Sequence, residues 1–182
     1  MLRKLALICA LLSLASLLAY AQEQAKSGEV FGGYQLLHTS TGISGLDSFN
    51  LNGWNASASA FFTRNLGVTA DFAGVYGTPN LAGLGVKTNL YTFLFGPTVR
   101  FPNSSRVTPF AHALFGGGRI SGSLFGSSAS ETDFTWAAGG GVDVNLSKNF
   151  AIRVGQADFL QTRVAGDSQN HLRFSTGIVL KF

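Results

Sequence analysis

Apolar and polar side chains alternate along most of the chain. Between residues 54 and 62, Trp, Ala and Phe take the even positions, and Asn or Ser takes the odd positions up to 59. A period of two is typical of a β-strand whose faces meet different surroundings. The final segment is the clearest: one face carries Leu172, Phe174, Ile178, Leu180 and Phe182, and the other carries His171, Arg173, Ser175 and Lys181.

The connections between such segments alternate in length. Tight ones lie at 64–65, 102–106 and 147–149, and looser Gly/Ser-rich ones at 39–52, 77–85, 122–130 and 166–169. Short turns at one end and longer loops at the other are typical of transmembrane β-barrels. Aromatic residues gather near strand ends, where a membrane interface favours them: Tyr34, Trp54, Tyr76, Tyr91 and Trp136.

The composition supports strands rather than helices. The chain has 16 Phe and 23 Gly, and Gly is costly in helices whereas Phe favours pleated surfaces. No long apolar stretch follows Leu18. A mature chain that spans a membrane must therefore close into a barrel, because lipid offers no hydrogen-bond partner to a backbone group that is left unpaired.

Eight strands are predicted. We expect them at 28–38, 53–64, 66–76, 87–101, 107–120, 132–145, 150–161 and 170–182. Pro97 interrupts the fourth, because proline cannot donate to a ladder of hydrogen bonds. Residues 156–158 interrupt the alternation of the seventh. Each interruption predicts a β-bulge or a strand end outside the lipid zone.

The first 21 residues have the features of a cleaved signal peptide. A basic start is followed by an apolar run, and Ala19 and Ala21 form a small-x-small cleavage site. We expect two regions, 1–21 as signal peptide and 22–182 as one barrel domain. Cys9 leaves with the signal, so the mature chain should have no thiol.

Charge argues against a polyanionic partner. The formal net charge of +4 falls to +2 once Arg3 and Lys4 are removed. No basic run occurs in the mature chain. We therefore expect no binding to nucleic acid.

The chain end resembles a known targeting signal. Ile178, Leu180 and Phe182, with the aromatic residue last, are similar to the C-terminal signal that bacterial barrel-assembly machinery recognises. The whole mature chain resembles the small eight-stranded family that includes OmpX and the OmpA membrane domain. The resemblance implies an all-β, closed, antiparallel, up-and-down transmembrane barrel in the bacterial outer membrane. It further implies a monomer whose partners are outer-membrane lipid and, during biogenesis, the assembly machinery.

Charged residues on inward faces predict a polar network in the lumen. Eight strands leave an interior that side chains fill, and charges buried there must be paired. We interpret this network as structural, with His112 as a further candidate. Its expected members are Asp71, Arg100, Asp143, Arg153 and Arg173.

One spacing is similar to that of a catalytic pair. His38 and Ser40 would share one face of a strand, and some barrels that deacylate lipid A use a His-x-Ser pair. The nearby acid, Asp47, lies in a predicted loop with nothing to fix it, so the pair is interpreted as loop residues. The three His lie on different strands, so no metal site is expected. We predict no enzyme and no cofactor.

The leading functional hypothesis is a structural or surface-interaction role through extracellular loops. A narrow solute or ion pore, a lipid A-modifying enzyme and a soluble periplasmic lipocalin-like barrel are the alternatives. The soluble barrel requires the opposite sidedness, with a polar exterior and an apolar, ligand-holding interior.

Overall fold

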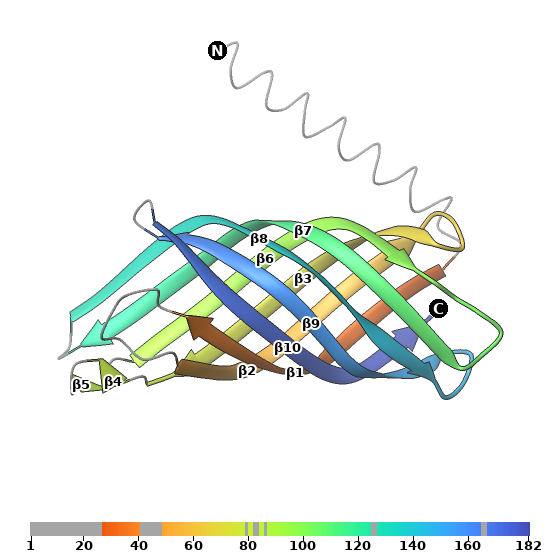
Figure 1. The fold of residues 1–182 in the computed structure, drawn as a ribbon, viewed down its shortest axis with the longest axis horizontal. Coiled ribbons are helices and arrows are strands. Elements are labelled where there is room, and N and C mark those ends of the chain that lie inside the picture. The colour runs from red at the N-terminus through yellow and green to blue at the C-terminus, as the bar shows by residue number, and fades with distance from the viewer. Residues whose placement is uncertain are drawn as a thin grey trace, which may run out of the picture.

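Eight long strands close into one antiparallel barrel (Figure 1). The computed structural model describes residues 27–40, 49–78, 80–81, 84–85, 87–124, 127–164 and 167–182. Each barrel strand pairs with its neighbours in the chain, and β1 pairs with β10 to close the sheet. The fold predicted from the sequence is confirmed. The barrel strands are β1 (Ser27–Ser40), β2 (Phe49–Phe61), β3 (Leu66–Gly77), β6 (Lys87–Arg100), β7 (Val107–Leu124), β8 (Ser127–Asn145), β9 (Phe150–Val164) and β10 (Asp167–Lys181).

The two ends of the barrel differ. The short turns at 62–65, 101–106 and 146–149 lie at the end that holds Ser27 and the C-terminus, here called the termini end. The opposite end, here called the hairpin end, carries the small sheet of β4 (Asn80–Leu81) and β5 (Leu84–Gly85) and the tips of β7 and β8 (Figure 1).

Two predicted loose loops are instead paired strands. β7 and β8 stay in register up to Leu124 opposite Ser127, and β9 and β10 up to Val164 opposite Asp167. Continuing the ladder through Gly/Ser-rich sequence satisfies backbone groups that a loop would leave to water. The expectation of long loops at 122–130 and 166–169 was therefore wrong. Most of the expected loop 39–52, at 41–48, lies outside the described residues.

The outside of the barrel is apolar and the inside is largely polar. Trp54, Phe72, Phe93, Phe115, Phe134 and Phe174 are exposed on the outer wall. Inward-facing polar residues are buried, among them Asn55, Asp71, Thr92, Thr135, Asp143 and Arg173. A soluble lipocalin-like barrel requires the reverse arrangement, so that alternative is wrong. Within the described ranges, no helix is long and apolar enough to cross a membrane.

A ring of aromatic side chains marks one edge of the apolar wall. Trp54 Nε1 donates to the hydroxyl of Tyr76 at 3.2 Å, and Tyr76 meets Tyr91 edge to face at 5.8 Å. Tyr34 donates to Asn52 at 2.7 Å. The eleven residues of β3 from 66 to 76 rise about 25 Å along the axis of a tilted barrel, which matches the apolar band of outer-membrane barrels.

A β-bulge in β9 explains the break in its alternation. Opposite β8, Gly155 pairs with Val142 and Arg153 with Asp143, so Val154 is an extra residue. The bulge lies before the predicted site at 156–158. It lets Arg153 and Gln156 both point inward, although their numbers differ by three. Thr176 of β10 donates to the carbonyl of Arg153 at 2.9 Å, which gives that backbone group a partner in the wall.

Pro97 produces neither a bulge nor a strand end. β6 continues through it to Arg100, and its pairing with β3 is unbroken, with Pro97 opposite Val68. Pairing with β7 passes directly from Phe95 to Thr98 without a register shift. Proline has no N–H to donate, so pairing with β7 is interrupted only at this position. The flanking pairs, Phe95–Phe115 and Thr98–His112, keep the same register.

Thr176→Val should destabilise the barrel. The change keeps the side-chain shape but removes the donor to the Arg153 carbonyl. Thr176 lies on the lipid-facing outer wall, and a carbonyl that loses its partner there, away from water, costs about 1–3 kcal/mol in the free energy of unfolding. Urea unfolding of the protein in phospholipid vesicles measures the loss. Thr176→Ser keeps the hydroxyl and should cost less than about 0.5 kcal/mol; equal losses in both variants would contradict the role of the hydroxyl.

Candidate functional site

Arg173 lies at the centre of the interior and joins opposite walls of the barrel. Its side chain extends from β10 and is 1% exposed. Nη1 donates to Asp71 Oδ1 on β3 at 2.7 Å, and Nε donates to Asp158 Oδ2 on β9 at 2.7 Å. Nη2 also lies 2.7 Å from Asp158 Oδ2, as a charge contact rather than an aligned hydrogen bond. One guanidinium thus bridges two carboxylates.

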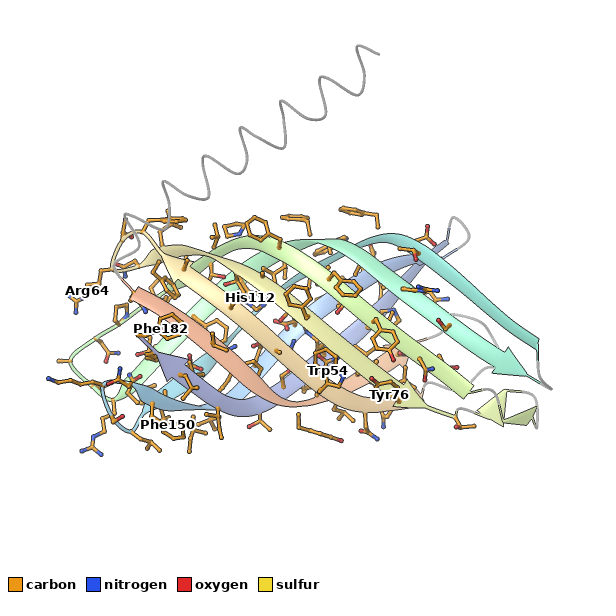
Figure 2. All side chains as sticks on the ribbon, turned by 180° about the vertical axis from the view of Figure 1, so that it is seen from behind. Trp54, Arg64, Tyr76, His112, Phe150 and Phe182 are labelled. Atoms are coloured by element: carbon orange, nitrogen blue, oxygen red, sulfur yellow. The ribbon has the colours of Figure 1, made fainter. Side chains whose placement is uncertain are left out.

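Asp158 is the second hub of this cluster. His112 Nε2 of β7 lies 2.8 Å from its Oδ1, and Gln156 donates to its Oδ2 at 2.7 Å. On the other side, Asn55 of β2 donates to Asp71 Oδ2 at 2.9 Å. Two carboxylates face one guanidinium and one imidazole, so the cluster is neutral when His112 carries a proton. In Figure 2 the label of His112 lies between those of Phe182 and Trp54.

A second layer lies toward the termini end. Arg153 makes a two-point contact with Asp143, at 2.8 and 3.2 Å, and donates to Gln156 Oε1 at 2.7 Å. Its guanidinium lies between the rings of Phe31 and Phe110, at 4.4 and 4.1 Å from their centroids. Gln156 therefore connects this layer to the Arg173 cluster. The stacked rings leave little room beside the charge.

The third layer closes the termini end. Arg100 donates to Glu29 Oε1 at 2.6 Å and to the hydroxyl of Ser27 at 2.7 Å. It lies over the ring of Phe61, 3.8 Å from the centroid. Lys181 approaches the same carboxylate at 3.5 Å. Arg100 is 15% exposed, so water reaches this layer.

Apolar side chains fill the interior toward the hairpin end. Two buried clusters lie there: one comprises Leu94, Leu114, Ala137 and Leu160, and the other comprises Leu37, Leu51, Val75 and Leu90. His171 is buried between the hydroxyls of Thr39 and Thr162, at 3.0 and 2.9 Å. The sequence pattern predicted polar inward faces, and these leucines depart from it. They close the lumen without needing hydrogen-bond partners.

Little space remains between the layers. The cavity bounded by Glu29, Arg100, His112, Asp143 and Arg153 measures about 10 Å³. That is the lower limit for a single water molecule. Ion pairs and apolar clusters together fill the described interior, so the arrangement is suited to plugging the barrel rather than to conducting.

The structure places all five sequence-predicted network residues inside the barrel, in three layers of which Gln156 connects two. Asp71 and Arg173 share the central cluster, Asp143 pairs with Arg153, and Arg100 lies apart at the termini end. Asp158 and Glu29 were missed. The bulge at Val154 shifts the alternation of β9 by one residue, so the sequence pattern did not place Asp158 on the inward face. Alternation counted back from Tyr34 would have placed Glu29 inside.

The His38–Ser40 pair has no catalytic arrangement among the described side chains. His38 faces outward, and its Nδ1 lies 2.8 Å from Asn50 Oδ1. The side chain of Ser40 and all of Asp47 lie outside the described residues. Within those residues, no group of three His, Cys, Asp or Glu side chains could hold a metal ion. The absence of enzyme activity stays a prediction.

Removing the central cation should be the most damaging change in the interior. Arg173→Met leaves two buried carboxylates without their shared partner and should lower the free energy of unfolding by about 3–5 kcal/mol. Arg100→Met should cost about 1 kcal/mol, because water and Lys181 remain near Glu29. Urea unfolding in phospholipid vesicles compares the two. Losses of similar size would show that burial does not set the strength of these pairs.

Comparisons with known proteins agree with this geometry. The family model described as "outer membrane protein beta-barrel domain" matches residues 7–182. A comparison with curated protein sequences finds no match.

Solved barrels cover nearly all of the described chain. The attachment invasion locus protein Ail of Yersinia pestis is 22% identical, with a TM-score of 0.62 over 86% of this chain and 98% of that one. Neisserial surface protein A is 17% identical, with a TM-score of 0.72 over 85% and 97%. OprG from Pseudomonas aeruginosa is 11% identical, with a TM-score of 0.57 over 87% and 97%. At these identities the likeness shows the fold, whereas the family match covers almost the whole chain. The chain belongs to the outer membrane protein β-barrel family.

Proposed function

We propose that this outer-membrane barrel is a surface-interaction protein that makes its contacts through the hairpin end. The observation that carries the proposal is the contrast between its two halves. Among the described residues, paired charges and apolar clusters fill the interior, which argues against a passage for a solute. Toward the hairpin end, in contrast, the strands continue past the ring of aromatic side chains that marks the edge of the apolar wall.

The β7–β8 hairpin makes most of this extension. Seven residue pairs follow Gly117–Phe134, where Phe134 still lies on the apolar wall, and they run from Gly118–Asp133 to Leu124–Ser127. Seven pairs correspond to about 23 Å of strand. Figure 1 shows this hairpin reaching far along the hairpin end of the barrel. A paired ladder offers a partner a preformed surface, which lowers the entropic cost of binding.

The orientation follows from the asymmetry of the ends. In barrels of this kind, short turns face the periplasm and longer connections face outward. The proposal therefore includes export through the signal peptide 1–21, cleaved after Ala21, and insertion as a monomer with the termini end in the periplasm. Ile178, Leu180 and Phe182 lie exposed on the outer wall, where assembly machinery could contact them before lipid does.

The named neighbours are compatible with a surface role. One is called an attachment invasion locus protein and another a surface protein. Ail was also solved in complex with the heparin analogue sucrose octasulfate. These names belong to those proteins, and they suggest a cell surface as a first probe for this one. Heparin is a poorer probe here, because the mature chain has no basic run.

Shortening the hairpin should remove binding without disturbing the barrel. Replacing residues 122–129 by Asn-Gly closes a two-residue hairpin on the Ser121–Ser130 pair. Cells that display the full chain should be retained on a monolayer of cultured epithelial cells. Cells with the shortened chain should be retained no better than cells without it, because the tip of the projecting hairpin is gone.

Two controls make this result decisive. The shortened protein must keep the change in gel mobility on boiling that marks a folded barrel. Ser128→Cys should react with a membrane-impermeant maleimide on intact cells, whereas Ser147→Cys, at the termini end, should react only after lysis. Undiminished retention of the shortened chain would contradict the hairpin as the contact surface, and reversed labelling would contradict the orientation.

A further inference from the structure

An apolar groove runs down the outer wall at the termini end. It holds about 540 Å³. Ala58 and Ala60 of β2 and Val68 and Ala70 of β3 form its floor, and the rings of Phe95 and Phe182 stand at its sides. Both rings are exposed, Phe95 by 51% and Phe182 by 74%. The wall is thus indented over these small residues, between strands that carry large aromatic residues.

The turns that form the rim below the groove carry positive charge and no negative charge. Each of the three short turns at the termini end contains one basic residue and no acidic one: Arg64, Arg106 and Lys148. All three are exposed. Figure 2 shows Arg64 extending beyond the ribbon at the same end as Phe182. The rim therefore favours an anion.

Arg64 is the cation nearest to the groove along the chain, because its turn joins the two floor strands. The turn is fixed: Thr63 Oγ1 accepts from the backbone N–H of Leu66 at 2.9 Å, and the Arg64 carbonyl accepts from Arg100 Nε at 3.0 Å. Within the described ranges, no ion pair joins the Arg64 guanidinium to an acid. Glu29, which also lines the groove, is occupied by Arg100 and Lys181.

We propose that this groove and Arg64 form a binding site for an anionic phospholipid, with an acyl chain against the floor and the phosphate at the guanidinium. Lipid surrounds the whole outer wall, so the proposal is that this groove prefers an anionic phospholipid to a neutral one. An alkyl chain fits a surface of small apolar side chains between two rings. A guanidinium matches a phosphate group with two parallel hydrogen bonds.

A second copy of the barrel is a poorer occupant. A two-fold contact through this groove would bring the same surface of both copies together. Two copies of Arg64 would then approach each other, and the adjoining turns contain no acid to separate them. Charge complementarity instead favours a negatively charged headgroup. Among the described residues, the remaining negative charge on the rim is the carboxylate of Phe182, on the opposite side of the groove.

Local quenching by brominated lipid tests the site. Trp54→Phe and Trp136→Phe remove both native tryptophans, and Phe95→Trp places a single reporter on the groove. The full-length mature barrel is inserted into phosphatidylcholine vesicles that contain brominated phosphatidylglycerol or brominated phosphatidylcholine. We expect phosphatidylglycerol to be preferred at the reporter by about threefold to fivefold, the upper part of the range of one exposed ion pair.

Matched charge variants decide whether the preference is local. Arg64→Gln should abolish it, Arg64→Lys should keep most of it, and Lys148→Gln, in a turn that adjoins other strands, should leave it unchanged. Retained mobility change on boiling shows that each variant is folded. Equal quenching by both lipids would overturn the proposal. Equal effects of Arg64→Gln and Lys148→Gln would also overturn it in favour of diffuse attraction, and weak quenching by both lipids at high protein content would assign the groove to a second copy.

Discussion

The bridge from Arg173 to Asp71 and Asp158 follows from the constraint that shapes the whole molecule. A chain that crosses lipid as strands must close on itself to pair its backbone groups, and eight strands leave an interior only as wide as its side chains. Charges placed there cannot be solvated, so each needs a partner. The guanidinium of Arg173 meets this need for carboxylates on two other strands, and thereby connects opposite walls of the barrel.

The same constraint separates the interior from the functional surface. Toward the termini end, aromatic rings pack against Arg153 and Arg100; toward the hairpin end, leucine clusters replace charges altogether. Among the described residues, an interior filled in this way leaves only a cavity of about 10 Å³ between its charged layers. We therefore propose that recognition takes place at the parts that leave the apolar zone: the extended β7–β8 ladder at one end and the cationic turns at the other.

Much of this could be predicted from alternation alone, because residues facing lipid and lumen obey a period of two wherever the register is regular. β10 is such a case, and its inward Arg173 was identified. Prediction failed where the period breaks: the bulge at Val154 reversed the phase before Asp158. It also failed where chemistry does not follow sidedness. Leu94 and Leu114 face inward, since a small lumen accepts apolar filling as readily as paired charge. Gly/Ser-rich sequence at 122–130 suggested loops, yet backbone pairing there depends on the register inherited from the barrel.

Conductance across a planar lipid bilayer tests the closed interior most directly. The purified mature chain, inserted as a folded barrel, should give a flat current trace at every applied voltage, because the three charged layers and the leucine clusters leave no continuous aqueous path. Reproducible single-channel steps from the unaltered protein would contradict the account, and would move the functional site from the hairpin end to the lumen.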